Sequence, residues 1–349
     1  MMLIMMGWGK LIVFSSYGER WKRYRKYANL GFSEKLVVKY YDGQTNDVNI
    51  FLRRLIDSPE DFSKELNMLV GMVIMRIVYG YQVRESDDPF VTISDETIAS
   101  MSTTGVAGRY LVDSYPLLRF LPTWLPEELY QWARKQIASK DYNDEGKYIP
   151  SFLSELLESN EDDEQGEDII KRTAGSMYNA GSHTTVSTLN NFILAMVQYP
   201  NILRKAQEEM DRIIGTERLP TMSDRPNLSY LECIILETMR WYPITPLTVP
   251  HRIEKEDTYR GYRIPANSTV YANIYAITRD ERIFPEPESF IPERFDSTHS
   301  KFIFGIRRRT CPANNVADGT IYLAIANLIT SMNITKVRDE NGMRLSLKL

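Results

Sequence analysis

The sequence predicts a mainly α-helical protein with a small β region. Apolar residues recur at helical spacing through most of the chain, as at Tyr24, Tyr27 and Leu30. One helical segment runs from Ile169 to Tyr199 without an interruption. A single stretch, 259–277, combines turn residues with β-formers. Together these observations favour helices packed around one core, with a short hairpin region beside them.

The first half is expected to be helical up to a proline-rich connector. Helical spacing repeats around residues 52–56, and a further apolar stretch covers 66–81. Three prolines between 116 and 126 then interrupt the pattern. The acidic segment 158–168 is predicted to be a solvated loop between helices.

Three helices follow the acidic segment. The long one is predicted to end at Pro200, and the next to run from Ile202 to Ile214 with Gly215 as its C-cap. The third is expected to begin with a capping box, Ser229-x-x-Glu232, and to end at Trp241.

The last part of the chain contains the β region, a coil and one more helix. A hairpin is predicted within 259–277, and a proline-rich coil over 284–295. The final helix is expected to begin just after Cys311-Pro312, with Pro312 in its first turn, and to reach about Thr330.

The composition is that of a globular protein and excludes several classes. Of the 349 residues, 43% are hydrophobic and 25% charged, and the net charge of −4 gives no reason to expect a nucleic-acid partner. Two cysteines are too few for a disulfide framework, and together with three histidines they give no reason to expect a four-ligand zinc site. No apolar run reaches the roughly 20 residues that a membrane span needs. We expect a single domain over 1–349.

The segment Glu237-Thr238-Met239-Arg240 is the first candidate for a functional constellation. Its acid and base are three residues apart on a helix and share a face. Such pairs are usually solvated surface bridges, but the remaining residues of this helix are apolar, which favours burial. A buried pair needs further partners, and Arg294 in Pro292-Glu293-Arg294-Phe295 could supply them.

The second constellation runs from Phe304 to Ala313 and contains Cys311. A lone cysteine is more often an inert buried residue than a ligand. Cys311 follows three arginines, 307–309, and precedes a predicted helix, and both features favour the thiolate over the thiol. A thiolate held in this way is a suitable axial ligand for haem iron.

The three motifs in this order resemble the cytochrome P-450 family: Glu-x-x-Arg, then Pro-Glu-Arg-Phe, then a loop that starts with Phe304 and ends in Cys-Pro. The resemblance extends over nearly the whole chain and implies the cytochrome P-450 fold. It implies that Glu237, Arg240 and Arg294 form a structural triad and that Cys311 ligates haem b. The style of the loops is similar to that of fungal members.

The resemblance also implies further haem contacts. Arg309, two residues before the cysteine, is similar to a residue that binds a haem propionate, and Phe304 belongs to the same loop. Trp21-x-x-x-Arg25 and His251 match two other propionate contacts. Without the family, the Trp21 segment reads as a basic amphipathic surface helix, and His251 as an ordinary loop histidine.

An oxygen-activating segment is implied within the long helix. Residues 180–185, Ala-Gly-Ser-His-Thr-Thr, are similar to the family's Ala-Gly-x-(Asp or Glu)-Thr-Thr. Ala180 and Gly181 would leave room for dioxygen, and Thr184 would hydrogen-bond it and guide protons. Taken alone, the same small residues indicate close helix packing.

The chain departs from the family pattern at several points. His183 replaces the acid of the oxygen segment, and an imidazole with an ordinary pKa near ~6.5 could also relay protons. Arg307 and Ala313 replace two glycines around the cysteine. We also expect the N-terminal anchor, the first strands and the C-terminal strands to be absent.

The function implied is that of a monooxygenase, an oxidoreductase that inserts one atom of O2 into a small apolar organic substrate. Electrons would come from NADPH through a separate cytochrome reductase. Anchored relatives lie on the cytosolic face of the endoplasmic reticulum membrane, and peripheral attachment is expected here. Two alternatives stay open: a haem-thiolate isomerase, dehydratase or peroxide-driven enzyme, suggested by His183, and a non-catalytic remnant without haem, suggested by Arg307.

Overall fold

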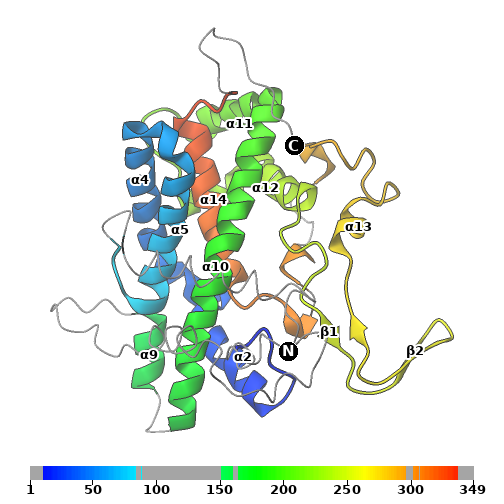
Figure 1. Ribbon diagram of the computed structural model, residues 1–349. Helices are drawn as coiled ribbons and strands as arrows, with labels where there is room; N and C mark the ends of the chain where they lie inside the picture. The colour runs from blue at the N-terminus through cyan, green and yellow to red at the C-terminus, as the bar shows by residue number, and fades with distance from the viewer. Residues whose placement is uncertain are drawn as a thin grey trace, which may run out of the picture. The chain divides into compact units, whose positions relative to one another are not determined.

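The computed structural model describes residues 11–83, 88, 151–159, 164–295, 302–305 and 307–336, and these are mainly helical (Figure 1). They divide into two compact units, one comprising Met1–His183 and Asn315–Ala317, the other Thr184–Asn314 and Asp318–Leu349. The division falls inside the longest helix, α10 (Glu164–Gln198). Mainly helical structure with a small β region is the class that the sequence predicts.

The first unit is built around α4 (Tyr41–Asp57) and α5 (Phe62–Tyr79), which lie side by side in Figure 1. Most residues of α5 from Glu65 to Val78 are buried, and Gly80 ends the helix in the left-handed conformation at φ 67°. Two ion pairs join these helices, Arg76 to the fully buried Asp47 and Arg54 to Glu65. Within the described part of this unit, the helices before α10 are α2 (Glu19–Phe32), α3 (Glu34–Val37), α4 (Tyr41–Asp57), α5 (Phe62–Tyr79) and α9 (Phe152–Glu158).

The predictions for this unit hold for its helices and fail for its acidic segment. The stretches around 52–56 and 66–81 are helical, although Leu30 and Ile56 are exposed. The connector at 116–126 lies outside the described residues. The acidic segment was expected to be a loop, but its residues from Glu164 onward belong to α10.

Ion pairs explain why the end of the acidic segment is helical. Glu167 contacts Lys171 at 2.6 Å and Asp168 contacts Arg172 at 2.8 Å, both one turn apart. Asp168 also contacts Arg20 of α2 at 2.9 Å. Counting charges alone therefore missed that these acids have basic partners at helical spacing.

The second unit continues with helices α11 (Pro200–Ile213), α12 (Ser229–Trp241), α13 (Ile274–Thr278) and α14 (Asn314–Ser331), except that residues 315–317 of α14 belong to the first unit. Pro200 occupies the start of α11, and Gly215 follows it at φ 77°, donating its N–H to Met210 O as a C-terminal cap. Short 3-10 turns η5 (Met222–Asn227), η6 (Pro292–Arg294), η7 (Phe302–Phe304) and η8 (Arg307–Arg309) join these elements.

The capping box predicted for α12 is wrong. The N-cap position is Leu228, which provides no side-chain hydrogen bond. Instead, Glu209 of α11 accepts the backbone N–H groups of Tyr230 and Leu231, each at 2.9 Å. Glu232, the expected box partner, is turned to Arg225. A carboxylate from another helix thus does what the local motif was expected to do.

The β region consists of two antiparallel pairs. Strands β2 (Asp257–Tyr259) and β3 (Tyr262–Ile264) form the predicted hairpin around Arg260-Gly261, both with positive φ. Strand β1 (His251–Arg252) pairs with β4 (Thr269–Val270), with His251 opposite Val270. All four strands are short.

Helix α14 begins at Asn314, close to the predicted start. Pro312 precedes the N-cap residue Ala313, so the prediction that Pro312 lies in the first helical turn is wrong. The helix is almost wholly buried from Thr320 to Ile329.

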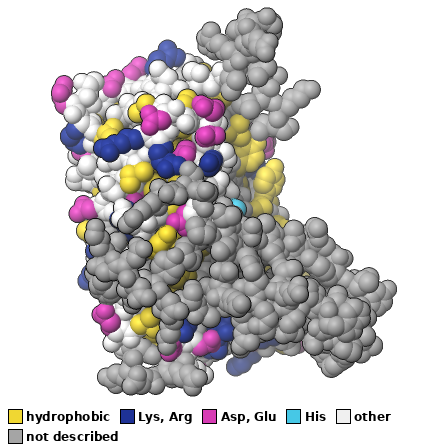
Figure 2. All heavy atoms as spheres, turned by 60° about the vertical axis from the view of Figure 1, so that its left-hand side comes forward, with side chains coloured by type: hydrophobic (Ala, Val, Ile, Leu, Met, Phe, Trp, Pro, Cys, Tyr) yellow, Lys and Arg dark blue, Asp and Glu magenta, His cyan; other side chains and the backbone are white. Residues whose placement is uncertain are grey.

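The described surface carries charges of both signs. On the face that Figure 2 shows, Lys and Arg side chains are interspersed with Asp and Glu over the described residues. Among the described residues, no helix is both long and apolar enough to cross a membrane.

Candidate functional site

A fully buried ion pair on α12 is the best-defined polar feature of the second unit. Glu237 and Arg240 lie one turn apart, and both side chains have no exposed area. Arg240 Nε donates to Glu237 Oε2 at 2.6 Å, and Nη2 donates to Oε1 at 2.8 Å. Two charges removed from water in this way need further hydrogen bonds to offset the loss of hydration.

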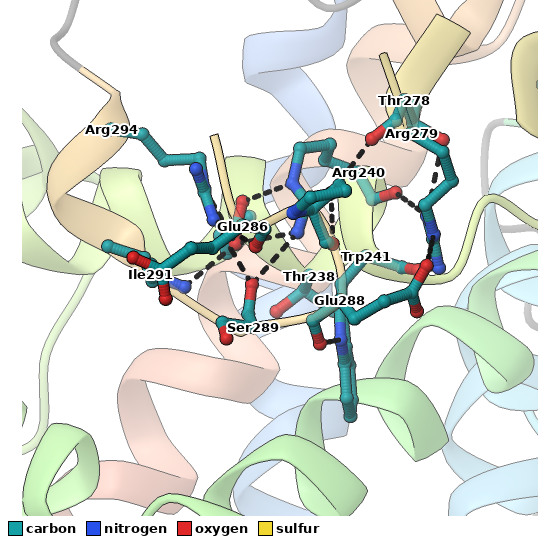
Figure 3. A network of polar contacts seen from close by, with 12 residues as sticks. Thr238, Arg240, Trp241, Thr278, Arg279, Glu286, Glu288, Ser289, Ile291 and Arg294 are labelled. Atoms are coloured by element: carbon teal, nitrogen blue, oxygen red, sulfur yellow. Dashed lines mark hydrogen bonds and ion pairs between the residues drawn. The ribbon is translucent and has the colours of Figure 1, made fainter. Parts of the chain in front are cut away.

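Backbone carbonyls supply those bonds for Arg240, as Figure 3 shows. Its Nη1 donates to Thr278 O and to Pro287 O, both at 2.9 Å, and Nη2 donates to Ser289 O at 3.2 Å. The planar guanidinium presents its donors in a fixed geometry that suits several acceptors at once. One side chain therefore holds a coil that has almost no secondary structure of its own.

Arg294 completes the constellation from η6. Its Nε donates to Glu237 Oε1 at 3.2 Å, and its other nitrogens donate to Pro285 O and Glu286 O. Glu237 Oε1 also accepts the backbone N–H of Ile291 at 2.8 Å. The structure thus brings together the three residues that the sequence singles out, with Arg294 on the coil and the pair on the helix.

Two further residues belong to this network and were missed. Trp241 Nε1 donates to Glu288 O at 2.8 Å. Arg279 donates to Trp241 O at 2.6 Å and contacts the Glu288 carboxylate at 3.0 Å. Because most of these acceptors are backbone carbonyls, no residue spacing in the sequence could have indicated the contacts.

The cysteine lies at the end of a closed loop in the same unit. Cys311 is half-buried, and its N–H donates to Phe304 O at 2.7 Å. Gly305 has φ 96°, and a Cβ there would come within 3.2 Å of Arg309 O. The hydrogen bond between Phe304 and Cys311 thus closes the loop, and Gly305 provides a positive φ within it.

Arg307 occupies a position that favours glycine. Its φ is 53°, in the left-handed region where a side chain is unfavourable. Thr310 holds this conformation, since its N–H and Oγ1 donate to Arg307 O at 3.1 and 2.8 Å. Arg307 and Arg308 are exposed, whereas Arg309 is half-buried.

Residues 180–185 of α10 divide between an exposed and a buried face. Ala180, His183 and Thr184 are exposed, and Thr185 is buried. A Cβ on Gly181 would lie 2.8 Å from Ile74 Cδ1, which supports the close-packing interpretation for this glycine. The backbone is continuous helix through the segment, and Thr184 O accepts the Thr188 hydroxyl at 2.9 Å.

The remaining predicted contacts lie on α2 and β1. Trp21 is buried, and the guanidinium of Arg25 lies 5.9 Å from the centre of its ring, one turn along α2. His251 is exposed on β1. Trp21 and Arg25 belong to the first unit, whereas His251, Arg309 and Cys311 belong to the second.

Comparison with known proteins gives one consistent result. A family model described as cytochrome P-450 matches residues 3–343. Cytochrome P-450 monooxygenase 176 of the fungus Postia placenta is 35% identical, the alignment covering 95% of this chain and 69% of the relative. Cytochrome P-450 monooxygenase claT of Ampulloclitocybe clavipes is also 35% identical, over 97% of this chain and 72% of the relative.

The fold comparison agrees with the sequence comparison. A solved structure of a zebra fish cytochrome P-450 with abiraterone superimposes with a TM-score of 0.74. The match covers 92% of this chain and 76% of that one, at 23% sequence identity, so it concerns the fold.

Proposed function

Because this chain belongs to the cytochrome P-450 family of haem-thiolate monooxygenases, we propose that it inserts one oxygen atom of O2 into a small apolar organic substrate. The electrons in this proposal come from NADPH through a cytochrome reductase on the cytosolic face of the endoplasmic reticulum. The observation that carries the proposal is the closed loop that presents the half-buried Cys311.

The residues of this loop suit a haem. A soft thiolate is the ligand that this chemistry needs, and Cys311 is a free, half-buried cysteine. The half-buried Arg309 places a cation close by in sequence for a propionate. Among the described residues, no cluster of three or more His, Cys, Asp or Glu side chains offers a competing metal site.

In this proposal Cys311 holds the iron, and Arg309, Trp21, Arg25 and His251 bind the propionates, with Phe304 at the head of the ligand loop. Bound haem would supply the binding and reductive activation of dioxygen. The triad of Glu237, Arg240 and Arg294 has a structural role in this proposal, because its members bind one another and backbone carbonyls. Its role is to fix the coil that leads into the cysteine loop.

Proton delivery falls to the exposed face of α10. Thr184 offers a hydroxyl that can both donate and accept, and the imidazole of His183 beside it is a second exposed hydrogen-bonding group. Ala180 has the smallest side chain on the same face, which leaves space for dioxygen. Gly181 contributes by letting α10 approach Ile74 closely.

The test is the carbon-monoxide difference spectrum of the reduced protein, expressed with a haem precursor. We expect a strongly red-shifted Soret band for the wild type and its complete loss in Cys311→Ala. Cys233→Ala is the matched control, because Cys233 Sγ instead contacts Phe295 O at 3.2 Å. A red-shifted band that survives Cys311→Ala would refute the assignment, and a wild type without haem would refute the function.

A further inference from the structure

Arg225 joins two helices that carry different parts of the proposed site. It lies in η5 and makes paired contacts with Glu232 of α12, Nε at 3.1 Å and Nη2 at 2.9 Å. It makes a second pair with Asp318 of α14, Nη1 at 2.7 Å and Nη2 at 3.1 Å. All three side chains are at least four-fifths buried, with exposures of 18%, 19% and 18%.

A tyrosine on α14 strengthens the same junction. The Arg225 guanidinium lies 4.9 Å from the centre of the Tyr322 ring, within range of a cation–π contact. The Tyr322 hydroxyl donates to Thr221 O at 3.0 Å, which ties α14 to the segment that carries Arg225. Burial alone would lower the pKa of Arg225, but Asp318 and Glu232 outweigh it and raise the pKa, so the cation is permanent.

The location of this junction relates it to the cysteine. Asp318 lies near the start of α14, the helix that directly follows the Cys311 loop. Glu232 lies in the first turn of α12, which carries Glu237 and Arg240 further along. Arg225 therefore sets the separation between the helix after the ligand and the helix that bears the triad.

We propose that Arg225 is a positioning residue for the Cys311 sulfur, acting through Asp318 and α14. The inference rests on the proposed function, in which Cys311 ligates haem. The physical reason is geometric: a planar guanidinium with two paired contacts permits little sliding between its partners, whereas an ammonium permits more. A ligand that must stay within about 0.5 Å of its productive position depends on such support.

The experiment compares haem-loaded variants as reduced carbon-monoxide complexes. Arg225→Met, Arg225→Lys and Asp318→Asn are measured for the rate at which the thiolate-type Soret band converts to the thiolate-free form. We expect conversion on the order of 10-fold faster in Arg225→Met and Asp318→Asn, in line with residues that support a metal ligand. Arg225→Lys should lie between these variants and the wild type.

The matched control is Arg218→Met. Arg218 pairs with Asp224 in the same segment at 2.6 Å and is about half exposed, so its loss perturbs the segment without breaking the link to α14. Thermal midpoints are recorded in parallel, and rates are compared at equal distance below each midpoint. Faster conversion confined to the Arg225 and Asp318 variants supports a positioning role.

Two results overturn the inference. If Arg225→Met and Asp318→Asn convert no faster than Arg218→Met, the junction only stabilises the fold. If the wild type shows no thiolate band at all, the proposed function fails and this inference fails with it. Asp318→Asn preserves side-chain shape, so the comparison stands even where Arg225→Met does not fold.

Discussion

At the scale of single residues, the cysteine loop contains a non-glycine residue in an unfavourable backbone conformation. Arg307 adopts φ 53° although its neighbour Gly305 already provides one left-handed position in the same turn. A side chain in that region costs about 1 to 2 kcal/mol because Cβ approaches the following carbonyl. The loop retains this cost since Thr310 and Cys311 both bond within it.

Replacing Arg307 by glycine should therefore stabilise the protein. The gain is partly offset by the greater freedom of glycine in the unfolded chain, so we expect about 0.5 to 1 kcal/mol. Urea unfolding of the apo protein measures it. Arg308→Gly is the control. The φ of Arg308 is not positive, so glycine at this position should lower the stability of the protein. If Arg307→Gly lowers the free energy of unfolding as much as Arg308→Gly does, the positive φ of Arg307 costs the fold nothing.

The residue scale also shows what sequence could and could not predict. Glu237, Arg240 and Arg294 meet as expected, since each is a charged group that needs the others once buried. Arg279 and Trp241 were missed because they bind backbone carbonyls, which every residue provides. Gly181 had two interpretations, and the structure supports packing against Ile74.

At the scale of elements, α12 is stabilised at its start and its end by groups from other segments. Glu209 binds its first amide groups, and Arg240 near its end binds one carbonyl at the end of α13 and two in the coil that follows. The helix was predictable from its apolar periodicity. Its cap was not, because a carboxylate from α11 outcompetes the local Ser229 motif.

Removing the Arg240 guanidinium should be among the most damaging single changes. Arg240→Met leaves Glu237 charged and buried with only Arg294 and Ile291 N–H as partners, and we expect a loss of about 3 to 5 kcal/mol. Arg282→Met is the control, since Arg282 is 89% exposed and forms an ion pair with Asp280, and it should change stability by less than about 0.5 kcal/mol. Chemical unfolding of both distinguishes them, and comparable losses would show that burial of the pair does not matter.

At the scale of the whole molecule, several carboxylates make the fold sensitive to acid. Hydrogen bonds from Arg218 hold the pKa of Asp224 at about 2 instead of 3.8. Burial would raise the pKa of Asp168 and of Glu293, but basic partners outweigh it and lower both. The pKa of Asp47 is shifted in the opposite direction, because burial raises it in spite of the ion pair with Arg76.

The sign of the pH effect follows from these directions. A carboxyl whose pKa is lower in the folded state contributes stability above its unfolded pKa, and that contribution is lost as the pH falls toward the folded value. We expect the free energy of unfolding to decline from pH 3.8 to about 2. In Asp224→Asn the slope of this decline should be smaller, because the unfolding reaction then takes up about one proton fewer. Unfolding midpoints of the apo protein against pH measure it, and an unchanged slope in the variant would rule out Asp224 as a source.

The sequence predicted the helices and strands of the fold more completely than the contacts of the candidate site. Helical periodicity, Pro200 and the turn at Gly261 placed most elements close to their observed bounds. The acidic segment failed as a prediction because its helix depends on pairing with Arg20, Lys171 and Arg172. Lys171 and Arg172 lie one turn away and their spacing was visible in the sequence, whereas the contact with the distant Arg20 was not.

The contacts of Arg240 also have a consequence for synthesis of the chain on the ribosome. Its carbonyl partners follow it by 38 to 49 positions. When α12 leaves the exit tunnel, its charged pair therefore has none of the acceptors that later offset its burial. We expect α12 to stay hydrated or chaperone-bound until Ser289 has emerged, so a translational pause before that codon would prolong an aggregation-prone state.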